Sequence, residues 1–190
     1  MGRPFPQEPT TDIAEFWTSF PQGATVLDVG CGEGGNAIFL AEKGFVVDAF
    51  DISWTGLEKA KGNAAARGVN VNFFREDFAK LKFKKSYDII LCHSVFHLCD
   101  KDARDLFLEQ VMKHTAPGGF NAIGVFTGRL PATPDMKPFT RSLFDVGELP
   151  AYYSDWELAH HWEGIFEDSY PDGIKHQHAY ERIIARKPGI

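Results

Sequence analysis

A glycine-rich turn near the start of the chain has the residue types of a ligand-binding loop. Residues 26–29 read Val-Leu-Asp-Val, a short run rich in β-branched residues that is typical of a buried parallel strand. Gly30, Gly32 and Gly34 alternate directly after it, and a helical pattern begins at Asn36. Because glycine has no Cβ, its backbone can approach a ligand closely, and the following helix presents free N–H groups to that ligand. The stretch therefore predicts a binding loop between a strand and a helix.

The spacing of the glycines alone leaves the kind of ligand open. A dinucleotide fingerprint needs the spacing G-x-G-x-x-G, and Gly35 can complete that longer spacing as well. Asp28, two residues before Gly30, favours a ligand with a cationic group such as an amino acid ammonium, because a carboxylate repels a pyrophosphate. An NAD-dependent oxidoreductase is therefore the less favoured alternative, and a glycine turn without any ligand is the other one.

Residues 26–34 resemble the first motif of the class I S-adenosylmethionine-dependent methyltransferases, which is two hydrophobic residues, an acidic residue, a variable residue and Gly-x-Gly-x-Gly. The resemblance implies an α/β, Rossmann-like fold: a seven-stranded sheet, mostly parallel with an antiparallel last strand, and helices on both faces. It also implies S-adenosyl-L-methionine as the cofactor, with contacts from four residues of this stretch: Asp28, Gly30, Cys31 and Gly32.

An acidic residue follows the second predicted strand, residues 45–50. Asp51 stands about twenty positions beyond the glycine loop, where a Rossmann-like fold places a carboxylate on the ribose hydroxyls. The alternative is that Asp51 caps the next helix, but Ser53 already stands at the start of the helix predicted over 54–67. The resemblance implies that the adenine is contacted by three further residues: Ile52, Asp77 and Phe78.

Two histidines follow the strand predicted over residues 87–92. Ligands of open α/β sheets bind beyond the carboxyl ends of the strands, so His93 and His97 are both expected near the mouth of the pocket. By resemblance, His93 contacts the methionine part of the cofactor, for which its backbone carbonyl would suffice. His97 is a candidate catalytic base, since an imidazole can take a proton near neutral pH, and a purely structural histidine is the open alternative.

The last third of the chain begins with a stretch that lacks a regular hydrophobic pattern. Residues 127–155 carry several prolines without a regular period, which predicts a lid-like insertion. Two strand-like segments follow, residues 156–163 and 174–186, and are expected to form a terminal hairpin. His176 and His178 alternate on the second segment and so share one face, where His176 is a candidate catalytic residue and His178 a candidate substrate contact.

Each of the remaining substrate contacts has a plain alternative. Two histidines that alternate on a surface strand can also be ordinary solvent-facing residues. Trp17 is either a wall of the substrate pocket or part of the core, with the core slightly favoured. Two arginines are weaker candidates for holding an anionic substrate: Arg141 and Arg182.

Segments in both halves of the chain narrow the resemblance. The stretch 36–44 after the glycine loop, Gly147-Glu-Leu149 and the run 172–178 are similar to the tellurite-resistance group of small-molecule methyltransferases. The resemblance implies methyl transfer to a small acceptor, with a metalloid oxyanion such as tellurite or a small thiol as candidates. A non-catalytic S-adenosylmethionine sensor on the same fold is a rival of a different class.

Composition bounds the remaining possibilities. With 190 residues, 44% of them hydrophobic, the chain is long enough for one globular domain over 1–190, with an N-terminal arm and helix over 1–22. A net charge of −6 disfavours nucleic acid and anionic membranes as partners, because both attract basic proteins. The three cysteines lack metal-site spacing, so we expect no metal and no disulfide, as in a reducing cytoplasm. The sequence leaves the oligomeric state open.

Overall fold

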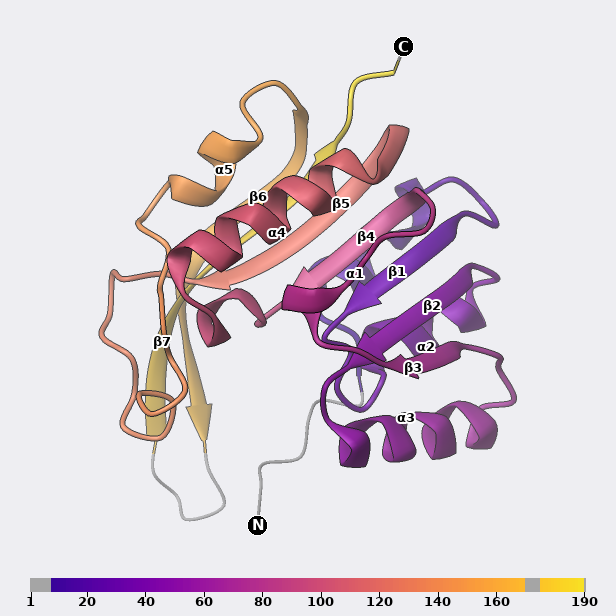
Figure 1. Ribbon diagram of the computed structural model, residues 1–190, viewed down its shortest axis with the longest axis horizontal. Coiled ribbons are helices and arrows are strands. Elements are labelled where there is room, and N and C mark those ends of the chain that lie inside the picture. Colours follow the sequence, from indigo (N-terminus) through magenta and orange to yellow (C-terminus); the bar gives the residue numbers. More distant parts are fainter. Residues whose placement is uncertain (1–7, 170–174, 190) are drawn as a thin grey trace.

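The computed structural model describes residues 8–169 and 175–189. One mixed sheet runs through this part of the chain in the order β3-β2-β1-β4-β5-β7-β6 (Figure 1). Strands β1 to β5 are parallel to one another, and β7 is antiparallel to both β5 and β6. This arrangement confirms the predicted Rossmann-like sheet with an antiparallel last strand. The strand bounds are β1 Thr25–Val29, β2 Val46–Asp51, β3 Asn72–Arg75, β4 Tyr87–His93, β5 Thr115–Phe126, β6 Glu157–Ser169 and β7 Lys175–Arg186.

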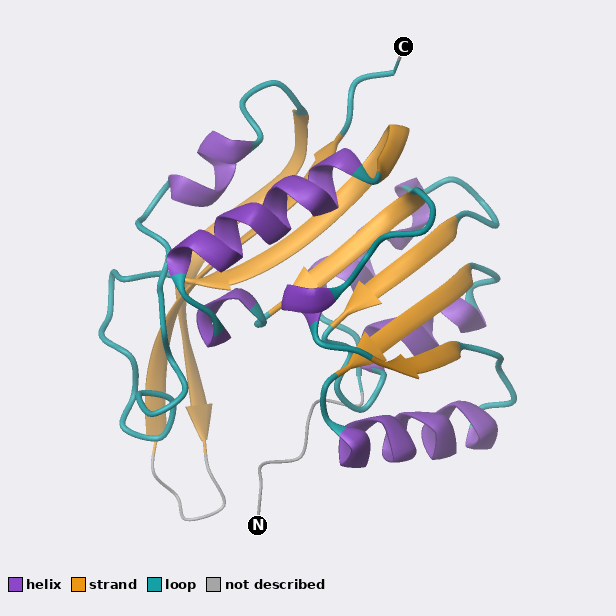
Figure 2. Cartoon of the chain, in the orientation of Figure 1, coloured by secondary structure: helices purple, strands orange, loops and turns teal. Residues whose placement is uncertain are grey.

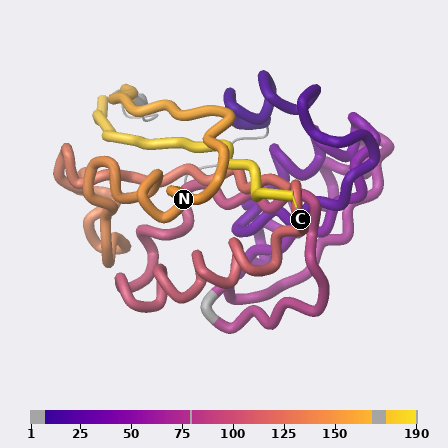
Figure 3. Tube along the Cα trace, turned by 90° about the horizontal axis from the view of Figure 1, so that it is seen from above, coloured from indigo at the N-terminus to yellow at the C-terminus, as the bar shows by residue number. Residues whose placement is uncertain are grey.

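Helices cover both faces of the sheet (Figures 2 and 3). The helix bounds are α1 Thr11–Phe16, α2 Gly35–Glu42, α3 Trp54–Ala66, α4 Lys101–Lys113 and α5 Glu148–Tyr152. Helices α1 and α2 bury apolar side chains, among them Ile13 and Leu40, on one face of the sheet. Helix α4 packs Phe107 and Leu108 on the opposite face, and Leu149 of α5 joins the same cluster.

The central strands are buried on both faces. In β4, Ile89 and Leu91 belong to the core under α1 and α2, whereas Ile90 and Cys92 belong to the core under α4. Successive side chains of a strand alternate between the faces, so a strand covered on both sides reads as a continuous apolar run. The parallel strands all end at one edge of the sheet, where the glycine loop and the residues after β4 lie.

Two elements, α1 and β5, are irregular near one end. Within the N-terminal arm and helix predicted over 1–22, α1 ends at Phe16 and a short 3-10 helix, Trp17–Ser19, follows. Strand β5 begins at Thr115 and contains an irregularity in its register against β4. The two strands approach closely at this irregularity, since a Cβ on Gly119 would lie 2.5 Å from the Asp88 carbonyl oxygen.

The terminal hairpin is also longer than expected. Strand β6 continues from Glu157 to Ser169, beyond the predicted end at Glu163. Its register with β7 places Arg182 opposite Trp162 and His178 opposite Phe166. The predicted start of the last strand, Ile174, lies outside the described residues.

Candidate cofactor-binding and active site

The glycine loop joins β1 to α2 in a conformation that requires glycine. Gly30 and Gly34 have φ angles of +67° and +89°, in the left-handed region that other residues rarely adopt. A Cβ on Gly30 would also lie 2.4 Å from Cγ2 of Val95, which belongs to the segment after β4. The loop can therefore pass close to that segment only because Gly30 has no side chain.

Asp51 holds this loop from the end of β2. Its Oδ2 accepts a hydrogen bond from the Gly32 backbone N–H at 2.9 Å, and its Oδ1 accepts one from the Ser53 N–H at 2.8 Å. Ser53 caps α3 as predicted, because its Oγ accepts a hydrogen bond from the Gly56 N–H. The Asp51 carboxylate is thus fixed beside the loop.

Two cavities adjoin the glycine loop and share Gly30 and Ser94 as lining residues. The larger, about 480 Å³, has mainly apolar walls with acidic residues at its rim. The smaller, about 150 Å³, has several polar lining residues, among them Asp28, Asn36 and His93. All nine residues predicted to bind the cofactor line one cavity or the other. The larger contains Gly30, Asp51, Ile52, Asp77 and Phe78, and the smaller contains Asp28, Gly30, Cys31, Gly32 and His93.

Asp28 places a nearly buried carboxyl group in the smaller cavity. Burial raises the pKa of Asp28 to about 7, although the charge of His93 and the backbone N–H of Ala37 act in the opposite direction. A cationic group in this cavity would stabilise the ionised form by charge attraction. The Asp28 carboxyl group therefore suits the ammonium group of a ligand in the smaller cavity. The larger cavity, with its apolar walls and the Asp51 carboxylate, suits an apolar ring system that carries hydroxyl groups.

Ser94, which sequence reasoning missed, lies where the two cavities meet. Its φ angle of 56° is the left-handed conformation, which is strained for a residue with a side chain. The Ser94 N–H donates to the Gly124 carbonyl at 2.9 Å, and its Oγ lies 3.3 Å from the Tyr180 hydroxyl on β7. The position directly after a buried strand was the only signal in the sequence.

Asp12 is a second residue that the sequence did not reveal as part of the site. Its Oδ2 lies 2.8 Å from His93 Nε2, and its Oδ1 forms an ion pair with Arg182 Nη1 at 3.6 Å. Burial alone would raise the pKa of Asp12, but the neighbouring His93 and Arg182 hold it well below its usual value. The carboxylate therefore stays ionised and ties α1 to the ends of β4 and β7.

His97 and His178 both pack against the ring of Phe126. The centroid of the Phe126 ring lies 5.0 Å from that of His97 and 5.5 Å from that of His178. Both imidazoles are buried, so the alternative of a solvent-facing His178 is wrong. Burial and the proximity of His178 lower the pKa of His97 to about 4. At neutral pH His97 is therefore uncharged.

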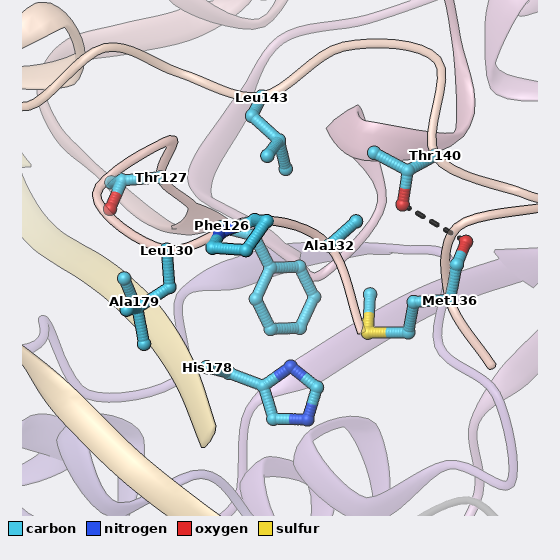
Figure 4. A pocket seen from close by; sticks show the side chains of 10 residues that line it. Phe126, Thr127, Leu130, Ala132, Met136, Thr140, Leu143, His178 and Ala179 are labelled. Carbon is cyan, nitrogen blue, oxygen red and sulfur yellow. Dashed lines mark hydrogen bonds between the residues drawn. The ribbon is translucent and has the colours of Figure 1, made fainter. Parts of the chain in front are cut away.

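The segment 127–147 packs over Phe126 and His178 (Figure 4). The remaining cavity between this segment and β7 is only about 10 Å³, with His178, Phe126 and Met136 among its lining residues. His176 Nδ1, further along β7, lies 3.8 Å from Asp135 Oδ1 of the same segment. The tail histidines thus contact the predicted lid, and the space there is too small for a substrate.

Two other predicted substrate contacts lie elsewhere. Trp17 packs edge-on against Phe39 at 6.4 Å between ring centroids, with Lys43 Nζ 4.9 Å from its ring. Because the Trp17 ring packs against α2 at the edge of the core, the core-packing alternative is favoured for this residue. Arg141 is exposed, and its backbone N–H donates to the His97 carbonyl at 2.8 Å. Arg182, the other weaker candidate, lies near the smaller cofactor cavity. It pairs with Asp12, and Asp12 contacts His93, which lines that cavity.

Comparisons with known proteins agree with this geometry. A family model described as a methyltransferase domain matches residues 26–119. The probable methyltransferase TehB of Haemophilus influenzae is 27% identical over 85% of this chain and 57% of its own length. The crystal structure of TehB from Haemophilus influenzae covers 94% of this chain and 62% of that one, with a TM-score of 0.82 and 22% identity. The chain belongs to the class I S-adenosylmethionine-dependent methyltransferases. It is of the TehB-like type, and its cofactor is S-adenosyl-L-methionine.

Two other relatives show how widely the family varies. Hemagglutinin 1 of Eikenella corrodens is 31% identical over 86% of this chain and 54% of its own length. The 2-heptyl-1-hydroxyquinolin-4(1H)-one methyltransferase of Mycobacteroides abscessus is 33% identical over 63% of this chain and 53% of its own length. The chain thus spans little more than half the length of the curated relatives it matches.

Two features are absent from residues 8–169 and 175–189. No helix in this part of the methyltransferase is long and apolar enough to cross a membrane. Within the same residues, no group of three or more histidine, cysteine, aspartate or glutamate side chains could hold a metal ion.

Proposed function

We propose that this methyltransferase transfers a methyl group from S-adenosylmethionine to a small-molecule acceptor. The observation that carries the proposal is the pair of cavities that meet at Gly30 and Ser94, because together they suit a ligand with two chemically different ends. Bound there, S-adenosylmethionine supplies a methyl group that its sulfonium already activates. With this cofactor, the NAD-dependent alternative is no longer needed.

The residues of the two cavities divide the binding between them. In this proposal the Asp51 carboxylate accepts hydrogen bonds from the ribose hydroxyls, and Asp28 pairs with the ammonium group. Ile52, Asp77 and Phe78 surround the adenine, and the remaining predicted residues line the methionine part: Gly30, Cys31, Gly32 and His93. The protein then contributes alignment of the acceptor and exclusion of water, which account for much of the acceleration in such reactions.

The likeness to TehB supports a metalloid oxyanion such as tellurite, or a small thiol, as the first acceptors to test. In such a reaction His97, which is uncharged at neutral pH, could hold a proton at its buried Nδ1. His176 and His178 lie under or beside segment 127–147, so movement of this lid-like segment would be needed before they could reach an acceptor. Arg141 is a further anion contact only if the same segment rearranges.

The test is S-adenosylhomocysteine release by the purified protein with tellurite, selenite and a panel of small thiols. We expect release with at least one acceptor, and its loss in Asp51→Ala, whereas Glu58→Gln on the exposed side of α3 should behave as wild type. Cofactor binding without release for every acceptor tried, including the aromatic compounds below, would favour the non-catalytic sensor. Failure to bind S-adenosylhomocysteine would reject the proposed function altogether.

A further inference from the structure

A third cavity of about 380 Å³ lies between α1 and the β6–β7 hairpin. Its lining comes from α1 and from the two consecutive strands β6 and β7, which lie far from α1 in sequence. Helix α1 contributes the acidic side, and the hairpin contributes aromatic and basic residues. The full lining is Thr11, Asp12, Glu15, His160, Trp162, Phe166 and Arg182. No role in cofactor binding is assigned to this cavity.

The contact between Asp12 and His93 lies where this cavity adjoins the smaller cofactor cavity, which would hold the methionine part of S-adenosylmethionine. His93 lines the methionine side, Asp12 lines the other side, and their side chains are 2.8 Å apart. A second connection runs through Tyr180, whose hydroxyl lies 3.3 Å from Ser94 Oγ and whose ring lies under the Arg182 guanidinium at 4.8 Å. A molecule in the third cavity therefore sits directly beside the methionine end of the cofactor.

The walls on the hairpin side are flat and apolar. Trp162 and Phe166 are both cavity residues of β6, and Trp162 keeps 38% of its surface exposed. Trp162 stands opposite Arg182 in the β6–β7 register, with the guanidinium carbon 5.5 Å from its ring. Exposed aromatic faces offer a large contact area to another ring at little entropic cost. The shape of the lining favours a planar aromatic ligand over a small spherical anion.

The polar groups of the cavity specify what such a ring must carry. Arg182 Nε is a buried donor without an acceptor among the described residues. Asp12 Oδ1 is buried and accepts no hydrogen bond from the same part of the chain, although it pairs with Arg182 by charge. Buried donors and acceptors are unfavourable until a partner satisfies them. A hydroxyl that donates to Asp12 and a second oxygen that accepts from Arg182 would satisfy both.

We infer that this cavity binds the methyl acceptor, and that the acceptor is a planar aromatic compound with a hydroxyl group and a neighbouring oxygen. The hydroxyl oxygen forms the bond to the methyl carbon while the carbon–sulfur bond of S-adenosylmethionine breaks, which leaves S-adenosylhomocysteine. The hydroxyl proton is lost to solvent through the Asp12 carboxylate that accepts its hydrogen bond. The inference rests on the proposed function, since it names the acceptor of the same site. It places recognition on Trp162, Phe166, Arg182 and Asp12, and not on the histidines under segment 127–147. A tellurite or thiol acceptor would leave the aromatic walls without a partner.

The experiment measures binding, so it does not depend on turnover. Catechol, salicylate and a hydroxyquinoline are titrated by calorimetry into the protein saturated with S-adenosylhomocysteine, which has no transferable methyl group. We expect at least one compound to bind, and Trp162→Leu and Arg182→Gln each to weaken it by about tenfold or more. Ile165→Ala and Arg186→Gln, on the same two strands but outside the cavity lining, should bind as wild type.

Three results would separate this inference from the proposed function. If none of the three compounds binds, or if both cavity variants bind as wild type, the acceptor assignment is wrong. Normal binding of S-adenosylhomocysteine in that case would leave the proposed function intact. The aromatic titrations are repeated without S-adenosylhomocysteine, so the cavity is tested even if that compound does not bind. Thermal unfolding of each variant establishes that a lost affinity is not lost folding.

Discussion

His93 at the end of β4 and Asp12 at the start of α1 are 81 residues apart in the chain, yet their side chains meet at 2.8 Å. The contact is almost completely buried, with 7% of the His93 side chain and 1% of the Asp12 side chain exposed. It fixes the N-terminal helix at the edge of the sheet where the parallel strands end. Residues directly before the helix, Glu8 and Thr10, line the smaller cofactor cavity, and the helix itself lines the third cavity.

Replacing Asp12 by asparagine should destabilise the fold by about 1–3 kcal/mol at pH 7, because a charged partner of His93 and Arg182 is lost. The folded-state pKa of Asp12 is depressed, so its contribution is present above the unfolded value near 4 and is lost as the pH falls below it. Urea unfolding at pH 7 and at pH 3 checks both points. The difference in the free energy of unfolding between wild type and Asp12→Asn should be smaller at pH 3 than at pH 7. Glu15→Gln, on the same helix, should unfold with the same free energy as wild type. An equal difference at both pH values would contradict the ionic account.

Asp28 should make cofactor binding depend on pH. Its pKa of about 7 in the unliganded protein means that it is largely neutral at pH 6 and ionised at pH 8. Since an ammonium ligand prefers the ionised form, affinity for S-adenosylhomocysteine should rise with pH, by up to about tenfold per unit below pH 7. Calorimetric titrations between pH 5.5 and 8.5, roughly one and a half units either side of that pKa, should show this slope. In Asp28→Asn the slope should disappear and the affinity at high pH should fall, and a slope that persists would assign it to another group.

The same pKa shift has the opposite consequence for folding. A carboxyl group whose folded pKa lies above its unfolded value of 3.8 favours the folded state at low pH, and this contribution is lost as the pH rises through about 7. Asp28→Asn should therefore gain stability relative to wild type between pH 5 and pH 8 when no ligand is present. Denaturant unfolding of both proteins measures this difference, and a loss of stability in the variant at pH 8 would refute it.

The glycine loop and the sheet could be predicted from sequence because their signals are local. Gly30 and Gly34 are needed for positive φ angles, and the apolar runs of β1 and β4 show burial on two faces. The place of Asp51 at the end of β2 follows from the same strand–loop–helix pattern. These features depend on neighbours within a few residues.

Asp12 and the third cavity could not be predicted because they depend on distant partners. A charged residue on a short amphipathic helix is normally expected to face solvent, and only contact with His93 and Arg182 buries Asp12. The pairing of Trp162 with Arg182 depends on the β6–β7 register, which a longer hairpin than predicted sets. For His178, alternation correctly gave a shared face with His176. Burial of that ring came from Phe126 and Phe166, on two other strands.

Substituting alanine for Gly30 should damage both folding and cofactor binding. The new Cβ would lie 2.4 Å from Val95 Cγ2, and alanine at a φ of +67° adds roughly 1–2 kcal/mol of backbone strain. Gly62, in the interior of α3, is the matched control because a Cβ there meets no atom within 4 Å. Gly62→Ala should stabilise the protein by about 0.5–1 kcal/mol, since alanine is the better helix former. Thermal unfolding and S-adenosylhomocysteine titration measure both variants, and shifts of the same sign would refute the account.

Arg104 joins α4 to the chain before α5, and its loss should loosen the end of segment 127–147. The side chain is fully buried, donates from Nη1 to the Leu143 carbonyl at 3.2 Å, and lies 3.8 Å above the Phe144 ring. Its Nε and Nη2 donate to the carboxylates of Asp105 and Glu148.

Arg104→Met should therefore cost about 2–3 kcal/mol, the range for losing buried hydrogen bonds to charged groups while keeping the side-chain volume. Lys101 contacts the same two carboxylates from the surface, so Lys101→Gln should have a much smaller effect. Urea unfolding ranks the two variants, and hydrogen exchange should show faster amide exchange at residues 143–149 in Arg104→Met only. Equal losses in both variants would mean that the buried guanidinium adds nothing beyond the surface ion pairs.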